Sequence, residues 1–266
     1  MIRDITIGQY YPAQSPVHRL DPRTKVIATM VYLVSLFCFE NMWGYVAAGL
    51  FFVAVVRLSG VPFRFLLRGL KPMVMLILFT AALNMFWTPG TVLFHVGIIK
   101  ITREGLWRGA FLVFRLILLI VGSSVMTLTT TPNQLTDAFE RLMSPLQRFR
   151  VPVAEIALMM SIALRFIPIL MEETDRIMKA QTARGADFTS GHLLHRMRQM
   201  IPLLVPLFVS AARRAGALAC AMDARCYHGG AGRTKMKPLK FGRHDVTAAA
   251  VVFMYLVILA AVVHWT

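Results

Sequence analysis

The sequence predicts an all-α integral membrane protein, with short transmembrane helices and long amphipathic helices at the cytoplasmic face. Of the 266 residues, 57% are hydrophobic and 16% are charged, whereas soluble domains carry about 25% charged residues. Five apolar runs are separated by polar segments, and more than half of the 29 lysines and arginines lie between Arg141 and Arg243. Because basic residues collect on the cytoplasmic side of membrane proteins, this distribution favours a membrane protein over a nucleic-acid-binding protein.

We expect residues 1–128 to form an N-terminal membrane region with about four spans. Its apolar runs are residues 26–39, 43–56, 72–87 and 109–128. The last of these is long enough to cross a hydrocarbon core of about 30 Å at about 1.5 Å per residue. The first two are shorter and are predicted to form a hairpin around the turn "ENMWG". The alternating segment "VLFHVGIIKI" predicts a short β-hairpin or an interfacial segment.

Residues 129–243 are predicted to form a module at the cytoplasmic face, and residues 244–266 a C-terminal transmembrane helix. The module opens with a Thr-Pro-Asn helix start at residues 131–133. Two helices of about thirty residues follow, and the first carries a charged face on an otherwise apolar surface. These helices are expected to be too apolar for solvent and too charged to span. The prolines expected to kink or interrupt them are Pro168, Pro202 and Pro206, and the charged face consists of Arg165, Glu172, Arg176 and Lys179.

The two long helices end in nearly the same way. The first ends in "QTARGADF", with Ala183, Arg184 and Gly185, and the second in "AMDARCYH", with the matching residues Ala224, Arg225 and Cys226. One interpretation is an ordinary helix C-terminus, where a cation stabilises the macrodipole and a glycine follows the last turn. That interpretation does not explain why the ending appears twice.

Over nearly its whole length the chain resembles the transmembrane T component of energy-coupling factor (ECF) transporters, the EcfT/CbiQ/BioN family. The motifs that carry the resemblance are "SPVHRLDPRTK", "TPNQLTDAFERL" and the two Ala-Arg endings. In that family two Ala-Arg-Gly motifs end two coupling helices, which dock in grooves of two ABC ATPase subunits. The resemblance implies that Arg184 and Arg225 are the coupling arginines, with Asp187 and Asp223 as supporting residues. Cys226 departs from the family's glycine, which puts the left-handed turn at that end in question.

The resemblance also implies the partners and the location. The chain would link two cytosolic ABC-type ATPases to a membrane substrate-binding S component, for uptake of a vitamin or a metal ion. It would not be an enzyme and would hold no cofactor or metal of its own. It would lie in the plasma membrane of a prokaryote with its N-terminus in the cytoplasm. As a hypothesis for the S-component contact, we take apolar side chains of the two long helices: Met159, Met160, Leu164, Leu203 and Leu207.

Several other functions fit the sequence less well. The sequence "DAR" at residues 223–225 is faintly similar to the start of the CDP-alcohol phosphotransferase motif, so a membrane-embedded transferase is the alternative. That chemistry needs several aspartates around divalent metal, and only Asp245 follows Asp223. The Gly-rich segment "YHGGAGRTK" lacks the Walker A pattern. His192 and His195 are spaced as possible metal ligands without a nearby acid. A self-sufficient secondary transporter would need more ionisable residues at mid-membrane than Arg115.

Overall fold

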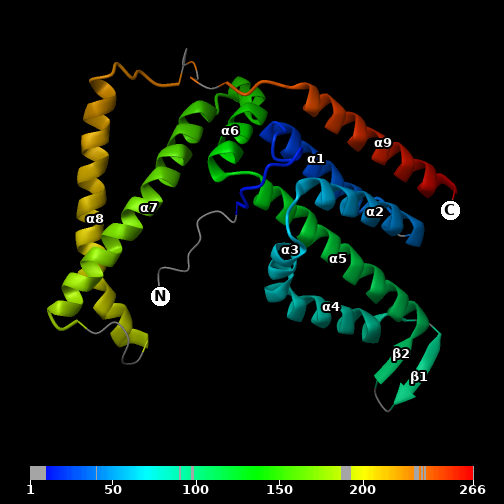
Figure 1. Ribbon diagram of the computed structural model, residues 1–266. Helices are drawn as coiled ribbons and strands as arrows, with labels where there is room; N and C mark the ends of the chain where they lie inside the picture. Colours follow the sequence, from blue (N-terminus) through cyan, green and yellow to red (C-terminus); the bar gives the residue numbers. More distant parts are fainter. Residues whose placement is uncertain are drawn as a thin grey trace. The chain divides into compact units, whose positions relative to one another are not determined.

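The computed structural model describes residues 10–39, 41–89, 91–96, 99–186, 193–230, 234, 236 and 238–265 (Figure 1). Its elements are α1 (Pro22–Ser35), α2 (Met42–Ser59), α3 (Phe63–Leu70), α4 (Val74–Trp87), β1 (Val92–Val96), β2 (Ile99–Thr102), α5 (Arg103–Thr129), α6 (Pro132–Leu142), α7 (Val153–Ala183), α8 (Leu193–Asp223) and α9 (Arg243–Trp265), with 3₁₀ turns at Lys71–Met73 and Ser144–Phe149. The predicted all-α fold class is confirmed. The antiparallel β1–β2 hairpin lies where the alternating segment predicted one.

The chain divides into two compact units, each described here by itself. The α5 unit comprises Gly8–Ala138 and Leu239–Thr266, and the α7–α8 unit comprises Phe139–Pro238. In the α5 unit, α5 packs against α1, α2, α3 and α4, while α9 packs against α1 and α2.

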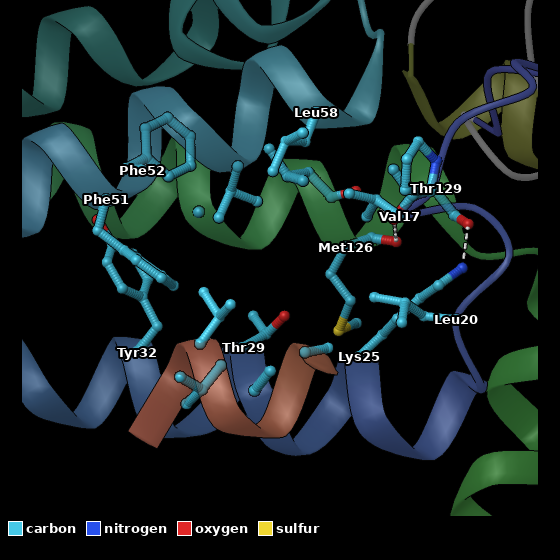
Figure 2. A pocket seen from close by; sticks show the side chains of 18 of the residues that line it. Val17, Leu20, Lys25, Thr29, Tyr32, Phe51, Phe52, Leu58, Met126 and Thr129 are labelled. Carbon is cyan, nitrogen blue, oxygen red and sulfur yellow. Dashed lines mark hydrogen bonds between the residues drawn. The ribbon is translucent and has the colours of Figure 1, made fainter. Parts of the chain in front are cut away.

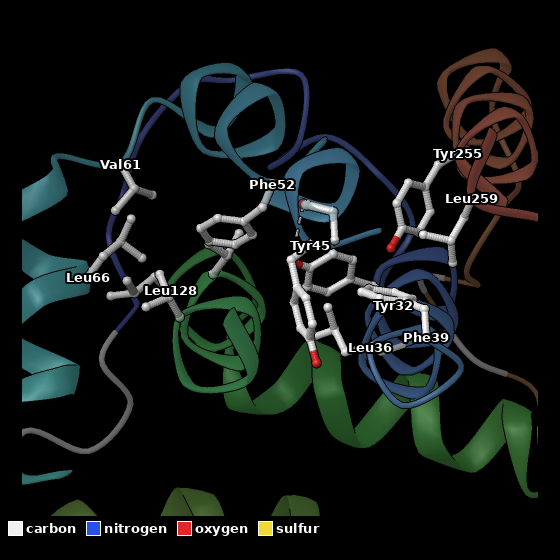
Figure 3. Packing of buried hydrophobic residues seen from close by; sticks show 13 residues of the cluster. Tyr32, Leu36, Phe39, Tyr45, Phe52, Val61, Leu66, Leu128, Tyr255 and Leu259 are labelled. Carbon is white, nitrogen blue, oxygen red and sulfur yellow. Dashed lines mark hydrogen bonds between the residues drawn. The ribbon is translucent and has the colours of Figure 1, made fainter. Parts of the chain in front are cut away.

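The core of the α5 unit is rich in aromatic side chains (Figure 3). Tyr32 of α1 lies within 6.0 Å of the Phe52 ring of α2 and within 6.0 Å of the Tyr255 ring of α9. The Tyr255 hydroxyl also shares a 2.8 Å hydrogen bond with Ser35. Aromatic pairs at these separations add to the stabilisation from buried area. The α1–α2 hairpin predicted from the two short apolar runs is therefore packed together with α9.

Arg115, in the middle of α5, has a structural role. Its Nε donates to the Tyr45 hydroxyl at 2.9 Å, and its Nη2 donates to the Phe39 carbonyl at 3.2 Å. Tyr45 in turn stacks on Phe111, with ring centroids 5.4 Å apart. A charge within a membrane segment is expensive unless it is paired or hydrogen-bonded. Here the guanidinium satisfies a carbonyl of the α1–α2 turn and ties that turn to α5.

The candidate membrane spans differ from the expected ones in two places. Among the described residues, six segments are long and apolar enough to cross a membrane: Met42–Ser59, Phe63–Met85, Arg103–Thr129, Val153–Ala183, Met200–Asp223 and Arg243–Trp265. Three of them lie within residues 1–129, and α1, with 14 residues that end at Ser35, is shorter than any of the six. The expectation of about four spans in residues 1–128 stays a prediction. Segments within α7 and α8 also meet this criterion of length and composition, so charge alone does not set them apart as expected, since most charges of α7 gather in its C-terminal half. Their location at the cytoplasmic face stays a prediction.

In the α7–α8 unit, α7 and α8 pack against each other in opposite directions. Gln181, near the end of α7, donates from Nε2 to the Pro202 carbonyl at 3.3 Å. Further along, Arg214 forms a 2.8 Å ion pair with Glu173. The helices continue through their internal prolines, so the expectation of an interruption is wrong. In Figure 1, α8 changes direction toward its N-terminal end, as expected where a proline ring displaces the preceding turn.

Candidate functional site

The end of α7 has a specific backbone geometry. Gly185 has a φ of +89°, in the left-handed region. Its N–H donates to the Thr182 carbonyl at 3.0 Å, and the N–H of Ala186 donates to the Gln181 carbonyl at 3.0 Å. These two bonds define a Schellman motif, in which the residue after the C-cap is left-handed. Arg184 is the C-cap residue. The turn therefore fixes the backbone conformation at the position from which the Arg184 side chain leaves the helix.

The end of α8 repeats this geometry with a cysteine in place of the glycine. Cys226 has a φ of +57°. Its N–H donates to the Asp223 carbonyl at 2.9 Å, and the N–H of Tyr227 donates to the Met222 carbonyl at 3.1 Å. The two bonds connect the same relative positions as at the end of α7, with Arg225 where Arg184 stands. The question raised by the departure from glycine is answered: the left-handed turn forms with cysteine.

The cysteine at this turn should cost stability, because a Cβ at positive φ is strained by about 1–2 kcal/mol. We expect Cys226→Gly to raise the free energy of unfolding by about 0.5–1 kcal/mol, since glycine's larger unfolded-state entropy offsets part of the gain. Thermal unfolding of the purified protein measures the change. Cys226→Ala, which removes the thiol and keeps the Cβ, is the control and should give no gain. An equal gain in both variants would assign the effect to the thiol instead of the backbone.

The two arginines are exposed and lie at opposite ends of the helix pair. Neither Arg184 nor Arg225 has a side-chain hydrogen bond or ion pair with another described residue. Because α7 and α8 run antiparallel and Gln181 contacts Pro202, the first arginine lies beside the N-terminal part of α8. At about 1.5 Å of rise per residue, the stretch from Pro202 to Arg225 spans about 35 Å. The site is therefore two separate points, each presenting one unengaged cation.

The other predicted residues of the two endings lie close to these arginines. Ala183, Ala224 and Asp223 are exposed, as is Cys226, whose thiol is free. Exposed small side chains beside each arginine leave room for another surface to approach. Asp187, the second expected supporting acid, lies outside the described residues, as does His192. Among the residues that are described, no three His, Cys, Asp or Glu side chains gather as metal ligands would.

The predicted apolar contact residues differ in exposure. Met159 is 59% exposed and Met160 is 43% exposed, whereas Leu164 and Leu207 are half-buried. Leu203 is only 5% exposed, so it packs inside the protein, next to the residue that Gln181 contacts. Its neighbours on α8 supply an apolar surface that the sequence reasoning did not select: Met200, Ile201, Leu204, Val205, Phe208 and Val209 are all exposed.

The Gly-rich segment after α8 also has a structural role. The N–H of Gly230 donates to Oε1 of Glu155, in the first turn of α7, at 3.0 Å. A Cβ at Gly230 would come within 2.7 Å of the Ala154 Cβ, a separation that side chains do not tolerate. The glycine therefore allows the backbone to approach α7 closely. Gly230 therefore connects the chain that follows α8 to the first turn of α7.

A second polar cluster, which the sequence reasoning did not assign, holds the C-terminus of α5. The N–H of Tyr11 donates to the Leu128 carbonyl at 2.9 Å. The Lys25 ammonium donates to the Thr129 carbonyl at 2.9 Å (Figure 2) and also to the His18 carbonyl at 3.1 Å. The last carbonyls of a helix lack partners within it and attract cations. Lys25 and the N-terminal segment thus cap α5 where the chain continues to α6.

The same cluster holds the start of α9. Oδ1 of Asp245 accepts the N–H of Asp21 at 2.7 Å, and its Oδ2 accepts the N–H of Gly242 at 2.7 Å. Asp21 caps α1 by accepting the N–H of Arg23 and pairs with its guanidinium at 3.0 Å. We call Tyr11, His18, Asp21, Lys25, Thr129 and Asp245 the polar clamp. A local signal that could have identified Asp21 is its place before Pro22, a helix-start pattern.

Burial lowers the pKa values of two basic groups in the polar clamp. Desolvation lowers the pKa of Lys25 to about 8, although the nearby carboxylates of Asp245 and Asp21 oppose this shift. Desolvation also lowers the pKa of His18. The Nε2 of His18 lies 3.0 Å from the Tyr11 carbonyl, and its Nδ1 lies 2.7 Å from the Ser15 hydroxyl. A carbonyl only accepts, so Nε2 carries the proton and Nδ1 accepts from Ser15 in the neutral ring.

The fold and the site together define a polytopic all-α membrane protein whose pair of long helices presents two matching, exposed arginine ends. Residues 13–236 match the family described as CbiQ, cobalt transport protein. Proteins named energy-coupling factor transporter transmembrane protein EcfT are similar along almost their whole length. The one from Thermosediminibacter oceani is 53% identical, and the match covers 93% of each chain. The one from Ruminiclostridium cellulolyticum is 52% identical, with 97% of this chain and 98% of the relative covered. The one from Bacillus subtilis is 49% identical, with 98% of this chain and 97% of the relative covered. The chain belongs to this CbiQ/EcfT family of transporter transmembrane components.

Proposed function

We propose that the chain is the energy-coupling subunit of an ECF-type ABC importer, joining two cytosolic ATPases to a membrane substrate-binding S component. The observation that carries this proposal is the pair of helix ends with matching backbone hydrogen bonds, each presenting an exposed arginine, about 35 Å apart along α8. Arginine offers a planar fork of donors that bonds carbonyls or carboxylates in a groove. Two such points on a stiff helix pair suit two separate ATPase subunits.

The orientation and the transport cycle follow from this assignment. More than half of the lysines and arginines lie between Arg141 and Arg243, which supports a cytoplasmic location for the two arginine ends and for the N-terminus. The membrane would be the plasma membrane of a prokaryote. ATP binding and hydrolysis in the partner subunits would move the arginine ends, and α7 and α8 would pass this movement to the S component. The cargo would be a vitamin or a metal ion, selected by the S component.

Cross-linking from the helix ends tests the proposal. Cys226 is exposed one residue after Arg225, and Thr182→Cys would place a thiol near Arg184. In a Cys38→Ser, Cys220→Ser background, a thiol–amine cross-linker applied to the assembled complex should join each end to an ATPase subunit. The variant with both thiols should give an adduct containing two ATPase subunits. A chain with Cys38 as its only cysteine is the control and should give neither adduct. Adducts from Cys38 alone, or none from the helix ends, would contradict the proposal.

The apolar surface of α7 and α8 is the proposed contact for the S component, with Met159 and Met160 as its exposed members on α7. Met159→Glu should lower the retained S component about tenfold or more, because an unpaired charge in such a contact costs over about 1.4 kcal/mol. Retained ATPase should stay the same. Lys179→Glu, on the charged face, is the matched control. Co-purification that keeps the S component at its original level with Met159→Glu would contradict this assignment.

A further inference from the structure

A cavity of about 240 Å³ lies inside the α5 unit, bounded by α1, α2, α5 and α9 (Figure 2). Most of its lining is apolar, including Val17, Leu20, Phe52, Leu58 and Met126. A cavity of about 150 Å³ with a wholly apolar lining stays free of water and takes up small hydrocarbons. A larger space of the same chemistry is suited to a hydrocarbon ligand.

The two ends of the cavity differ in polarity. In Figure 2, Lys25 and Thr129 lie at one end, and the rings of Tyr32 and Phe51 lie at the other. Lys25 is only 5% exposed. Its ammonium has three donors, and among the described residues two carbonyls use two of them. The cavity is thus amphipathic, with a buried cation at one end and an aromatic wall at the other.

The position of the cavity indicates how a ligand enters. His244, Thr247 and Val251 line it from α9 and are themselves exposed, so the cavity opens on the α9 side. These residues lie in the first part of a candidate span, Arg243–Trp265. From His244 to Val252 the lining covers about 12 Å along α9, within one leaflet of a hydrocarbon core about 30 Å thick. Lipid therefore has direct access, with its headgroup at the end that carries Lys25.

We propose that this cavity binds one acyl chain of an anionic phospholipid, with the headgroup phosphate at the polar end lined by Lys25 and His244. The Lys25 ammonium at that end favours an anionic over a zwitterionic headgroup. The nearby carboxylates are already engaged, since Asp245 accepts two backbone N–H groups and Asp21 pairs with Arg23. The length and the apolar lining suit a hydrocarbon chain more than a polar solute. This binding is independent of the arginine ends of α7 and α8.

Native mass spectrometry of the detergent-purified protein, incubated with phosphatidylglycerol or phosphatidylcholine, tests the proposal. The wild type should retain phosphatidylglycerol at least about fivefold better than phosphatidylcholine, a difference of about 1 kcal/mol. Ala248→Phe fills the cavity from α9 and should abolish this difference. Ala249→Phe is the matched control, because Ala249 is exposed and does not line the cavity. If Ala248→Phe unfolds, the smaller Ala28→Leu, from the α1 wall, should give the same loss.

Three outcomes would overturn the proposal. The first is equal retention of the two phospholipids by the wild type, and the second is unchanged retention in both cavity-filling variants. The third is displacement of phosphatidylglycerol by an equimolar amount of oleate, which would assign the cavity to a free fatty acid. Retention of the ATPase subunits should be normal in Ala248→Phe, so failure of this proposal and failure of the proposed function remain distinguishable.

Discussion

Complexes purified with the Arg184→Ala/Arg225→Ala double variant are expected to lose both ATPase subunits, and transport should fall to background. Each guanidinium is exposed and has no side-chain partner among the described residues, so little internal stability is lost with it. Truncating one arginine of a buried, hydrogen-bonded pair costs about 2–5 kcal/mol of association. The two ends are about 35 Å apart along α8, and effects at such distant points add. The double variant should therefore lose more than about a thousandfold in affinity.

The single variants and their controls separate coupling from ordinary helix capping. Arg184→Ala and Arg225→Ala should each release part of the ATPase. Exposed arginines elsewhere on the same helices, Arg176→Ala and Arg213→Ala, should release none. Arg225→Lys keeps the charge but loses the planar fork, so it should restore only part of the binding. If the double variant inserts normally and keeps both ATPases, the two arginines are ordinary helix ends and the proposed coupling role is wrong.

Lys25→Met is expected to lower the free energy of unfolding of the protein by about 2–3 kcal/mol. The substitution keeps most of the side-chain volume but leaves the Thr129 and His18 carbonyls without this donor. A buried acceptor left unsatisfied costs about 1–3 kcal/mol. Methionine no longer buries a cation, which offsets part of that loss. The exposed Lys71→Met in the same unit is the control and should change stability little.

The pH dependence gives a second measurement of the same contact. The folded protein holds the pKa of Lys25 at about 8, below its ordinary value of 10.5. Between these values the unfolded chain binds more protons than the folded one, so this group's contribution to stability rises with pH from about 8 to about 10.5. Lys25→Met should lack this rise. Unfolding curves with the same slope in both proteins over this range would show that Lys25 is not desolvated.

The sequence was sufficient for features with local causes. Apolar runs and the distribution of basic residues identified a membrane protein, and the segment after Thr129 was correctly interpreted as a helix start. There Thr131 and Gln134 cap each other's backbone N–H groups, at 3.3 and 3.1 Å, as expected for a capping box. The left-handed residue after Arg184 was also predictable, because glycine in that position is a local signal.

Contacts between distant segments could not be predicted in the same way. The hydrogen bond from the Asp21 N–H to the Asp245 carboxylate joins residues 224 apart in the chain. No local sequence pattern around either residue predicts the other as its partner. Leu203 was placed on an exposed face, yet it is buried, because helical periodicity says which residues share a face but not which face meets a neighbour. The extent of α1 also depended on its packing and capping, because its apolar run (residues 26–39) continues past the end of the helix at Ser35.

What the sequence determined by itself is therefore the membrane class, the positions of most helices and the two repeated Ala-Arg endings. Those features depend on hydrophobicity, capping and backbone preference within a few residues. The tertiary structure decided that the two endings lie at opposite ends of an antiparallel pair, that Cys226 adopts the glycine-like turn, and that the N-terminal segment clamps α5 and α9. These depend on which surfaces pack together, because burial and hydrogen bonding between distant segments outweigh local preference there.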